Sequence, residues 1–298
     1  MNRKPVHTVP AKTVINFKSD FEEKLLCDGL TFSTGSACVF SCAFCYVDDL
    51  MRRNPHTRGI RKKGIPFEDV VIRRKDAVDV VKSQLLKGKG VQKHKNSSDK
   101  RVIYSSPLVD VAANMDLVRE TAEVCSLILE HRNWQIRLLS KSSLLYEVAK
   151  LIDAKWKDRV IFGFSTGTLD DDLAKAYEKG TARVSKRLKS LHKLQDEGYR
   201  TFGMICPSLP QEDYDKFARE MAAAIRVDRC EHVWAEVINE RGKSFTRTID
   251  ALNAAGLKEE AERLTEVKRG DLWEDYARKT FLAHTNYIGR KNCASCSM

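Results

Sequence analysis

The sequence has no run of about 18 apolar residues, so no segment is expected to cross a membrane. The first residues, MNRKPVHTVPAKTVINFK, are basic and lack the apolar core of a secretory leader. The nine cysteines are odd in number, and their clustering is not typical of a disulfide framework. We therefore expect a protein of the reducing cytoplasm. With 298 residues, of which 42% are hydrophobic, the chain can form one large α/β domain or two smaller ones.

Excess negative charge is absent, and the net charge of +11 comes from one part of the chain. Residues 52–101 hold 16 Lys and Arg against 5 Asp and Glu, whereas the remainder holds 36 of each. Such a segment is typical of a phosphate-binding surface, although a solvated loop is the alternative. No aromatic residue lies between Phe67 and Tyr104, so base stacking is not indicated there. The candidate nucleic-acid-binding residues are Arg52, Arg53, Arg58, Arg61, Lys62, Lys63, Lys93 and Lys95.

Strand-like runs alternate with helical patterns along most of the chain. The predicted strands are Leu30–Ser33, Arg101–Ser105, Gln135–Leu139, Val160–Ser165, Arg200–Cys206 and His232–Ile238. The helix candidates between them include Asp116–His131, a helix that Ser142 caps, and one around Leu188–Leu194. Six strands separated by helices predict a parallel sheet curved into a partial (β/α)6 barrel, an α/β fold. In such barrels the chemistry lies at the carboxyl ends of the strands.

The expected organisation has three parts. Residues 1–27 form an N-terminal extension, 28–242 the barrel, and 243–298 a helical extension with a polar tail. Within the barrel, residues 53–100 are expected to form a long basic connection. Cys293 and Cys296 form C-x2-C, for which we expect a frayed tail; a second cluster, a zinc half-site and a redox pair are alternatives.

The stretch CVFSCAFCY places three cysteines at Cys38, Cys42 and Cys45. Thiolates select zinc, copper(I) or iron–sulfur clusters. A structural zinc site needs four ligands, and Cys27 or His56 would have to supply the fourth. Three cysteines on an iron–sulfur cube instead leave one iron open for a small molecule.

The C-x3-C-x-aromatic-C pattern after a first strand resembles the radical S-adenosylmethionine (SAM) superfamily. The resemblance implies that Cys38, Cys42 and Cys45 bind a [4Fe–4S] cluster. It also implies that the open iron chelates the amino and carboxylate groups of SAM. An electron from a flavodoxin- or ferredoxin-type donor would then split SAM and start radical chemistry on a substrate.

A narrower resemblance, over roughly residues 28–242, is to the spore photoproduct lyase-like branch. It rests on LLSKSSLL, on FGFSTGTLDDDLAKAYEKGTARVSKRLKSLHKLQDEGY, on MICPSLP and on VWAEVINERG. The positions that match this branch are Lys141, Ser165, Thr166, Glu178, Arg187, Pro207 and Pro210.

The resemblance implies cofactor-binding roles for residues around the cysteines and at the strand ends. These residues are Phe44, Tyr46, Ser105, Lys141, Ser165, Thr168, Glu178, Arg187, Asn239 and Arg241. Core packing is the alternative for Phe44 and Tyr46, and turn capping for Ser165 and Thr168. Glu178 and Arg187 are expected either to pair and hold a SAM-facing loop or to be solvated.

One position departs from the branch. The lyase that repairs thymine dimers uses a cysteine near the end of the second strand as a hydrogen donor, but the matching stretch here is IYSSP. Tyr104 takes that place, and Cys206 is the alternative radical partner. The departure favours a radical reaction other than dimer repair.

We therefore expect a radical SAM enzyme of lyase or isomerase type, acting on a nucleic acid or nucleotide base, with a modified pyrimidine in DNA favoured. The alternatives are a radical SAM enzyme acting on a small molecule or peptide, and a zinc-stabilised nucleic-acid-binding protein without catalysis.

Overall fold

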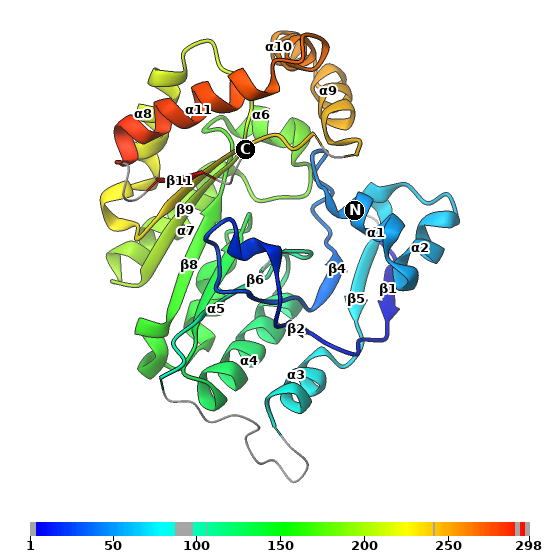
Figure 1. The fold of residues 1–298 in the computed structure, drawn as a ribbon, viewed down its shortest axis with the longest axis vertical. Helices are drawn as coiled ribbons and strands as arrows, with labels where there is room; N and C mark the ends of the chain where they lie inside the picture. The colour runs from blue at the N-terminus through cyan, green and yellow to red at the C-terminus, as the bar shows by residue number, and fades with distance from the viewer. Residues whose placement is uncertain (1–3, 87–97, 106, 241, 290–292, 296–298) are drawn as a thin grey trace.

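A computed structural model describes residues 4–86, 98–105, 107–240, 242–289 and 293–295. Within these residues a large sheet has the strand order β11-β10-β9-β8-β7-β6-β3-β2 (Figure 1). Its strands are β2 Ile15–Asn16, β3 Leu30–Phe32, β6 Val102–Ser105, β7 Gln135–Ser140, β8 Val160–Ser165, β9 Arg200–Ser208, β10 Val233–Val237 and β11 Cys293–Ser295. Neighbouring strands from β3 to β11 are parallel, and β2 is antiparallel to β3. The six parallel strands and the α/β fold predicted from the sequence are confirmed.

Helices pack on the outer face of this sheet and complete the βα units. They are α4 Met115–His131, α5 Leu145–Leu151, α7 Val184–Asp196 and α8 Tyr214–Ile225, whereas α6 Asp171–Tyr177 lies at the upper end of the sheet in an apolar cluster with residues of the C-terminal extension. Helix α4 begins at a cap, because the side chain of Asn114 accepts a hydrogen bond from the Leu117 amide. The apolar faces of these helices share one core with the outward side chains of the strands, which is the layer that keeps the sheet curved.

The C-terminal extension is helical, as predicted, and consists of α9 Ser244–Ala254, α10 Lys258–Arg269 and α11 Trp273–Ile288. These helices lie over the upper end of the sheet in Figure 1. The expectation of a frayed tail is wrong at Cys293–Ser295, which pair with Val233–Ala235 as strand β11. Cys296 falls outside the described residues. None of the described helices is long and apolar enough to span a membrane.

A small lobe beside the sheet was not predicted. It contains β1 Val6–Val9, β4 Gly35–Ala37, β5 Val71–Arg74, and the helices α1 Val47–Arg53 and α2 Pro55–Lys62, whereas α3 Ala77–Leu85, which follows β5, packs on α4 in the core of the main sheet. Its three strands have the order β1-β5-β4 and lie to the right of the main sheet in Figure 1. The described part of residues 53–100, which the sequence predicts to be a long connection, contains regular structure that buried Val71, Ile72, Val81 and Leu85 support.

Residues 21–27, just before β3, pack on the inner face of the sheet, and we call this segment the plug. Arg137 points inward from β7 and donates to the carbonyls of Leu25 (3.1 Å) and Leu26 (2.7 Å). Its guanidinium lies 4.8 Å from the ring centre of Trp234, whose Nε1 donates to the Lys24 carbonyl at 2.9 Å. This plug closes the floor of the barrel and leaves the strand ends above it as the place for chemistry.

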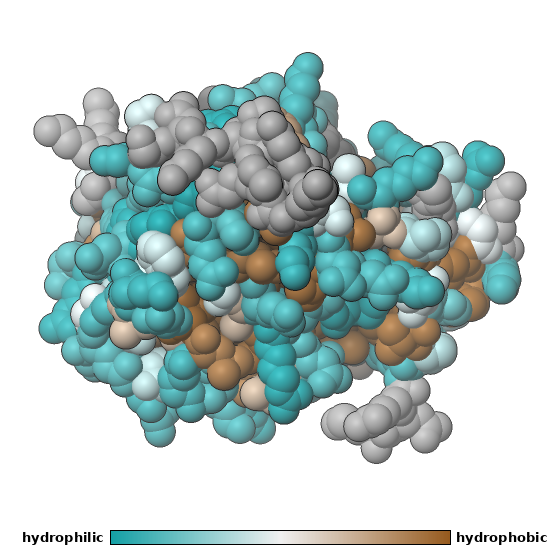
Figure 2. Space-filling view, turned by 90° about the horizontal axis from the view of Figure 1, so that it is seen from below, coloured by the Kyte–Doolittle hydropathy of each residue, from teal (hydrophilic) through white to brown (hydrophobic). Residues whose placement is uncertain are grey.

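Seen from below, the molecule presents mainly hydrophilic side chains, among which apolar ones show through in patches (Figure 2).

Candidate active site

The three cysteines of the motif lie on the loop between β4 and α1, which we call the cysteine loop (residues 38–46). Its thiols are free; Cys42 is buried, and Cys38 and Cys45 are half-buried. The loop turns tightly, because the Cys45 amide donates to the Cys42 carbonyl at 3.1 Å and Ser41 has a φ of 55°. The sequence predicted that the loop follows the first barrel strand, but β4 of the small lobe lies between them.

The three sulfurs are electrostatic neighbours. Burial raises the pKa of all three thiols, that of Cys45 to about 12. The charge of Glu178 and, to a lesser extent, those of Cys38 and Cys45 further raise the pKa of Cys42, which Lys141 opposes, and the charge of Cys38 raises the pKa of Cys45. A group that takes up three thiolates must therefore bring positive charge of its own, as iron does.

This donor set fits a cluster better than a single ion. Among the described residues no three His, Cys, Asp or Glu side chains lie close enough to share one metal ion. Each cysteine of an iron–sulfur cube binds a different iron, so its three sulfurs are spaced more widely than the ligands of one zinc ion. The loop thus offers three soft donors, the number of cysteines that leaves one iron of such a cluster open.

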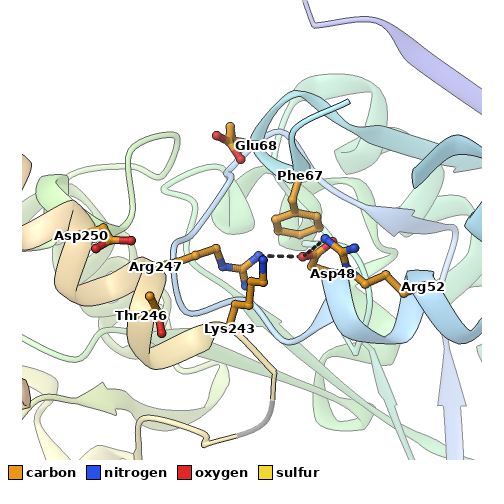
Figure 3. Close-up of a pocket in the computed structure, with 8 residues that line it drawn as sticks. All are labelled: Asp48, Arg52, Phe67, Glu68, Lys243, Thr246, Arg247 and Asp250. Carbon is orange, nitrogen blue, oxygen red and sulfur yellow. Dashed lines mark hydrogen bonds and ion pairs between the residues drawn. The ribbon is translucent and has the colours of Figure 1, made fainter. Parts of the chain in front are cut away.

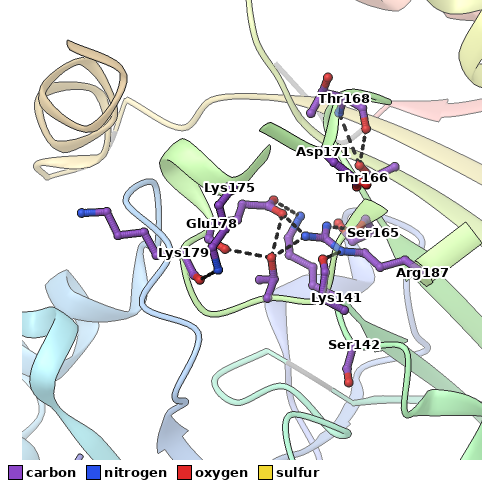
Figure 4. Close-up of polar contacts among 12 residues, drawn as sticks. Lys141, Ser142, Ser165, Thr166, Thr168, Asp171, Lys175, Glu178, Lys179 and Arg187 are labelled. Carbon is purple, nitrogen blue, oxygen red and sulfur yellow. Dashed lines mark hydrogen bonds and ion pairs between the residues drawn. The ribbon is translucent and has the colours of Figure 1, made fainter. Parts of the chain in front are cut away.

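A buried ion triad lies beside the loop at the strand ends (Figure 4). Glu178 accepts from the Lys141 ammonium at 2.6 Å and from the Arg187 guanidinium at 2.5 Å. The side chains of Glu178 and Arg187 are each 1% exposed. Burial opposes the ionisation of Glu178, but Lys141 and Arg187 outweigh it and lower its pKa below the usual range. The pairing of Glu178 with Arg187 expected from the sequence is present.

The triad fixes a turn that docks on the cysteine loop. The Tyr177 carbonyl accepts from the Ala43 amide at 2.8 Å, and the Gly180 amide donates to the Phe40 carbonyl at 2.9 Å. A Cβ on Gly180 would lie 2.6 Å from the Cα of Phe40, so only glycine allows this approach. The loop that Glu178 and Arg187 hold is therefore in direct backbone contact with the cysteine loop.

Phe44 contributes the apolar part of this neighbourhood. Its ring packs edge-on against Tyr177 with centroids 5.8 Å apart. The Lys141 ammonium lies 5.3 Å from the centre of the Phe44 ring. The packing alternative weighed from the sequence is thus present, while a cofactor contact remains a prediction.

Cys206 belongs to a polar group on the inner face that the sequence did not reveal as a unit. Its Sγ lies 3.2 Å from Glu236 of β10, and Glu236 pairs with Lys24 of the plug at 2.8 Å. A glutamate inside the apolar strand VWAEV was the available signal. Tyr104 is 3% exposed in a cluster with Leu26 and Cys27 of the plug, against which Cys206 also packs. Of the two predicted radical partners, half-buried Cys206 is the more exposed.

Asp110 was also missed. Its buried carboxylate accepts from the Ser140 hydroxyl (2.8 Å) and the Lys141 amide (2.8 Å), which positions the strand end that carries Lys141. After burial, the charge of Asp110 is the main cause that raises the pKa of Cys38.

The remaining predicted cofactor residues have protein partners at the strand ends. Ser105 and Ser165 donate to the carbonyls of Phe32 and Cys206, both at 3.2 Å. Thr168 accepts from the Asp170 amide at 3.0 Å, which is a capping contact. The Tyr46 hydroxyl donates to the Pro107 carbonyl, and half-buried Asn239 lies two residues after β10, whereas Arg241 falls outside the described residues.

The predicted nucleic-acid-binding residues gather on α1 and α2 as far as they are described. Arg52 and Arg53 pair within α1 with Asp48 (3.3 Å) and Asp49 (2.7 Å), and Arg58 is exposed. Lys63 just after α2 is exposed as well. The side chains of Arg61 and Lys62, and the residues Lys93 and Lys95, lie outside the described part of the chain.

A cavity of about 370 Å³ opens where α1 faces α9 (Figure 3). Its lining includes Asp48, Phe67 and Arg247, and an adjoining cavity of about 330 Å³ reaches Cys45. The outer side of the cysteine loop is thus open to solvent through a hollow of mixed charge.

The chain matches the family model described as spore photoproduct lyase over residues 107–290, a range that begins after the cysteine loop. It is 24% identical over 234 residues to an uncharacterized protein of Acidianus two-tailed virus, across 74% of this chain and 71% of that protein.

Solved structures of spore photoproduct lyase share the fold. A mutant with bound AdoMet and dinucleoside spore photoproduct has a TM-score of 0.52 and 13% identity. The match covers 76% of this chain and 61% of the length of that lyase. Another mutant has a TM-score of 0.63 and 11% identity over 97% of this chain and 81% of the other. At these identities the structures show the fold alone. Because the family model matches more than half of the chain, the protein belongs to the spore photoproduct lyase family, a branch of the radical SAM superfamily.

Proposed function

We propose that the protein binds a [4Fe–4S] cluster through Cys38, Cys42 and Cys45 and uses S-adenosylmethionine to act on a base of a nucleic acid or nucleotide. The proposal rests chiefly on three free thiols on one loop, one buried and two half-buried, where the loop docks by backbone hydrogen bonds at the strand ends of a barrel of this family. When bound, the cluster supplies the electron that splits SAM into methionine and a radical that abstracts hydrogen from the substrate. The electron donor would be of the flavodoxin or ferredoxin type.

Lys141 is suited to bind a carboxylate beside the loop. Two of its three N–H donors have partners among the described residues, Glu178 and the Cys206 carbonyl at 2.7 Å. The remaining donor and the net positive charge of the triad favour an anion, such as the carboxylate of SAM or of a substrate. The Phe44 ring lies 5.3 Å from the ammonium and gives this side of the site an apolar surface.

Cys206 is suited to give a hydrogen atom to a substrate radical. Its S–H bond would break as a C–H bond forms on the substrate, leaving a thiyl radical that one electron from the flavodoxin- or ferredoxin-type donor and one proton would return to the thiol. Glu236 accepts the hydrogen bond of the thiol and, together with burial, raises the pKa of Cys206 well above its usual range. The sulfur therefore keeps its hydrogen until it is needed. The competing donor, Tyr104, is only 3% exposed.

A modified pyrimidine in DNA is the favoured substrate class. Spore photoproduct lyase structures of the same fold hold a dinucleoside spore photoproduct. The exposed basic residues of α1 and α2 suit a phosphate backbone. A small-molecule or peptide substrate is the alternative that the missing cysteine near Tyr104 leaves open.

The first test is anaerobic reconstitution with iron and sulfide. We expect broad absorption in the blue–violet, lost in Cys42→Ala and retained in Cys125→Ala, which removes a buried thiol of α4. A colourless protein that binds zinc would contradict the proposal.

The second test separates the substrate classes. Reduced protein is incubated with SAM and either ultraviolet-irradiated DNA, untreated DNA or a peptide mixture. We expect 5′-deoxyadenosine release to rise most with irradiated DNA, and Cys206→Ala to reduce product formation while retaining the absorption. Equal release with peptides would favour the alternative.

A further inference from the structure

Arg247, in the first turn of α9, reaches back to the cysteine loop, which lies more than 200 positions earlier in the chain. Its Nε donates to the Ala43 carbonyl at 2.9 Å, and its Nη2 donates to the Cys45 carbonyl at 2.6 Å. One guanidinium therefore binds two carbonyls of the segment that joins Cys42 to Cys45.

The same guanidinium also connects the loop to the small lobe. Its Nη1 donates to Asp48 at 3.1 Å, across the cavity drawn in Figure 3. Its plane lies 5.2 Å from the centre of the Phe67 ring. Since Asp48 also accepts from Arg52 at 3.3 Å, the start of α1 is held together with the loop.

The peptide groups around Ala43 are held from two opposite partners. The Ala43 amide donates to the Tyr177 carbonyl of the barrel at 2.8 Å, while the Ala43 carbonyl accepts from Arg247 of the C-terminal extension. Because peptide groups are planar, fixing both sides of this residue restricts the directions in which the Cys42 and Cys45 side chains leave the backbone. The hydrogen bond to Tyr177 holds only the amide of Ala43, and the hydrogen bond from Arg247 holds only its carbonyl.

Helix α9 is a firm base for this contact. Phe245 and Leu252 of α9 are buried in one apolar cluster with Tyr177 and Tyr276. Arg247 itself is only about one-fifth exposed. A side chain on a packed helix holds its target more precisely than one on a loop.

We propose that Arg247 is a positioning residue for the cysteine loop, so that the C-terminal helices form part of the cluster-binding unit. This inference rests on the proposed cluster ligation by the three cysteines. The planar guanidinium suits the task because it serves three acceptors in fixed directions, whereas a lysine ammonium is a point charge on a flexible stem.

The test uses Arg247→Met and Arg247→Lys in the full chain, with Arg263→Met as the matched control. Arg263 is a C-terminal arginine of similar exposure that pairs with Glu212 and Glu260 rather than with the loop. In the iron-free protein, the alkylation rates of Cys42 and Cys45 by iodoacetamide are followed by mass spectrometry. We expect a rise of about tenfold in both Arg247 variants and none in the control, because charged hydrogen bonds to the loop are lost. Iron bound per chain after reconstitution is expected to fall by about half or more.

Unchanged alkylation and unchanged iron content in Arg247→Met would overturn the inference. Alkylation of Cys42 and Cys45 in Arg247→Lys at the rate of the unsubstituted protein would overturn the inference too, because the planar guanidinium would then be unnecessary. A fall in the urea midpoint of Arg247→Met that Arg263→Met reproduces, with equal alkylation, would assign Arg247 a merely structural role. If the unsubstituted protein takes up no iron, the proposed function fails, while the alkylation comparison still decides whether Arg247 holds the loop.

Discussion

The strand ends of the barrel and the α1 helix of the small lobe both carry arginine–carboxylate pairs, but in opposite settings. Arg187 is 1% exposed and binds Glu178 together with the carbonyls of Ser165 (2.9 Å) and Ala182 (2.7 Å). Arg53 is 75% exposed, and its partner Asp49 lies one turn earlier in the same helix at 2.7 Å. The distances are alike, so burial is what separates the two pairs.

The difference indicates which charges shape the fold and which face a partner. Removing one member of a buried group leaves the others charged and unsolvated, which costs several kcal/mol. An exposed pair within one helix contributes a few tenths of a kcal/mol and can be exchanged for an external phosphate at little cost. The triad of Lys141, Glu178 and Arg187 therefore holds the site, whereas the basic side chains of α1 and α2 are suited to recognition.

The substitution Glu178→Gln tests most directly whether the buried triad contributes more to stability than the exposed pairs. The substitution keeps the shape of the side chain but leaves Lys141 and Arg187 without their shared carboxylate. We expect the free energy of unfolding of the iron-free protein, measured in urea, to fall by about 3–5 kcal/mol. The control is Glu147→Gln, which removes the exposed partner of Lys150 and should change the value by less than about 1 kcal/mol. Equal effects of the two substitutions would mean that burial does not determine how much these ion pairs contribute to the free energy of unfolding.

His284 is a third kind of ionisable group, one that is buried but has no hydrogen-bond partner among the described residues. It is fully buried in α11 beside Phe217, and neither ring nitrogen has a hydrogen-bond partner in the described part of the chain. Burial lowers the pKa of His284 to about 4 from its usual 6.5. Between these values the unfolded chain binds a proton that the folded chain does not, so stability is lost as the pH falls through this window.

Two pKa units or more correspond to about 3 kcal/mol between pH 6.5 and 4. We expect His284→Leu to remove this part of the slope in urea unfolding measured at several pH values. The control His131→Gln, which changes a half-buried histidine at the end of α4, should keep the slope. If the slope of His284→Leu equals that of the unsubstituted protein, the imidazole is not held neutral by the fold.

Much of the barrel could be predicted because its strands are buried on both faces and therefore consist of continuous apolar runs. Strands β6 to β10 begin and end within about two residues of their predicted limits. The small lobe could not be predicted in this way. Its strands β1, β4 and β5 are short, and each finds its partner only far along the chain. In residues 53–86, frequent charges obscured the few apolar positions, such as Val81 and Leu85, that place α3 against the core.

In the candidate site, too, contacts between residues close in sequence could be predicted, whereas contacts between distant residues could not. Cys38, Cys42 and Cys45 are close in sequence, so their spacing alone carried the prediction. Glu178 and Arg187 are nine positions apart and could be paired from one turn. Lys24 with Glu236, and Arg247 with the cysteine loop, are joined only by the fold, and no local pattern marks them.

The smallest expected change in stability comes from substituting the exposed basic residues at α2. Arg58→Ala with Lys63→Ala removes two exposed charges at α2, and the free energy of unfolding should change by no more than about 0.5 kcal/mol. Binding to DNA, measured by fluorescence anisotropy at several salt concentrations, should nevertheless weaken. The slope of log K against log salt should become shallower by about 2, because each lysine or arginine on a phosphate contributes about one unit. The matched control, Lys150→Ala with Lys155→Ala, removes two exposed lysines from segments that follow β7 and should leave the slope unchanged. An unaltered slope in the α2 variant would show that these charges only solvate the lobe. The two regions would then differ in burial, but the exposed charges would have no role in binding DNA.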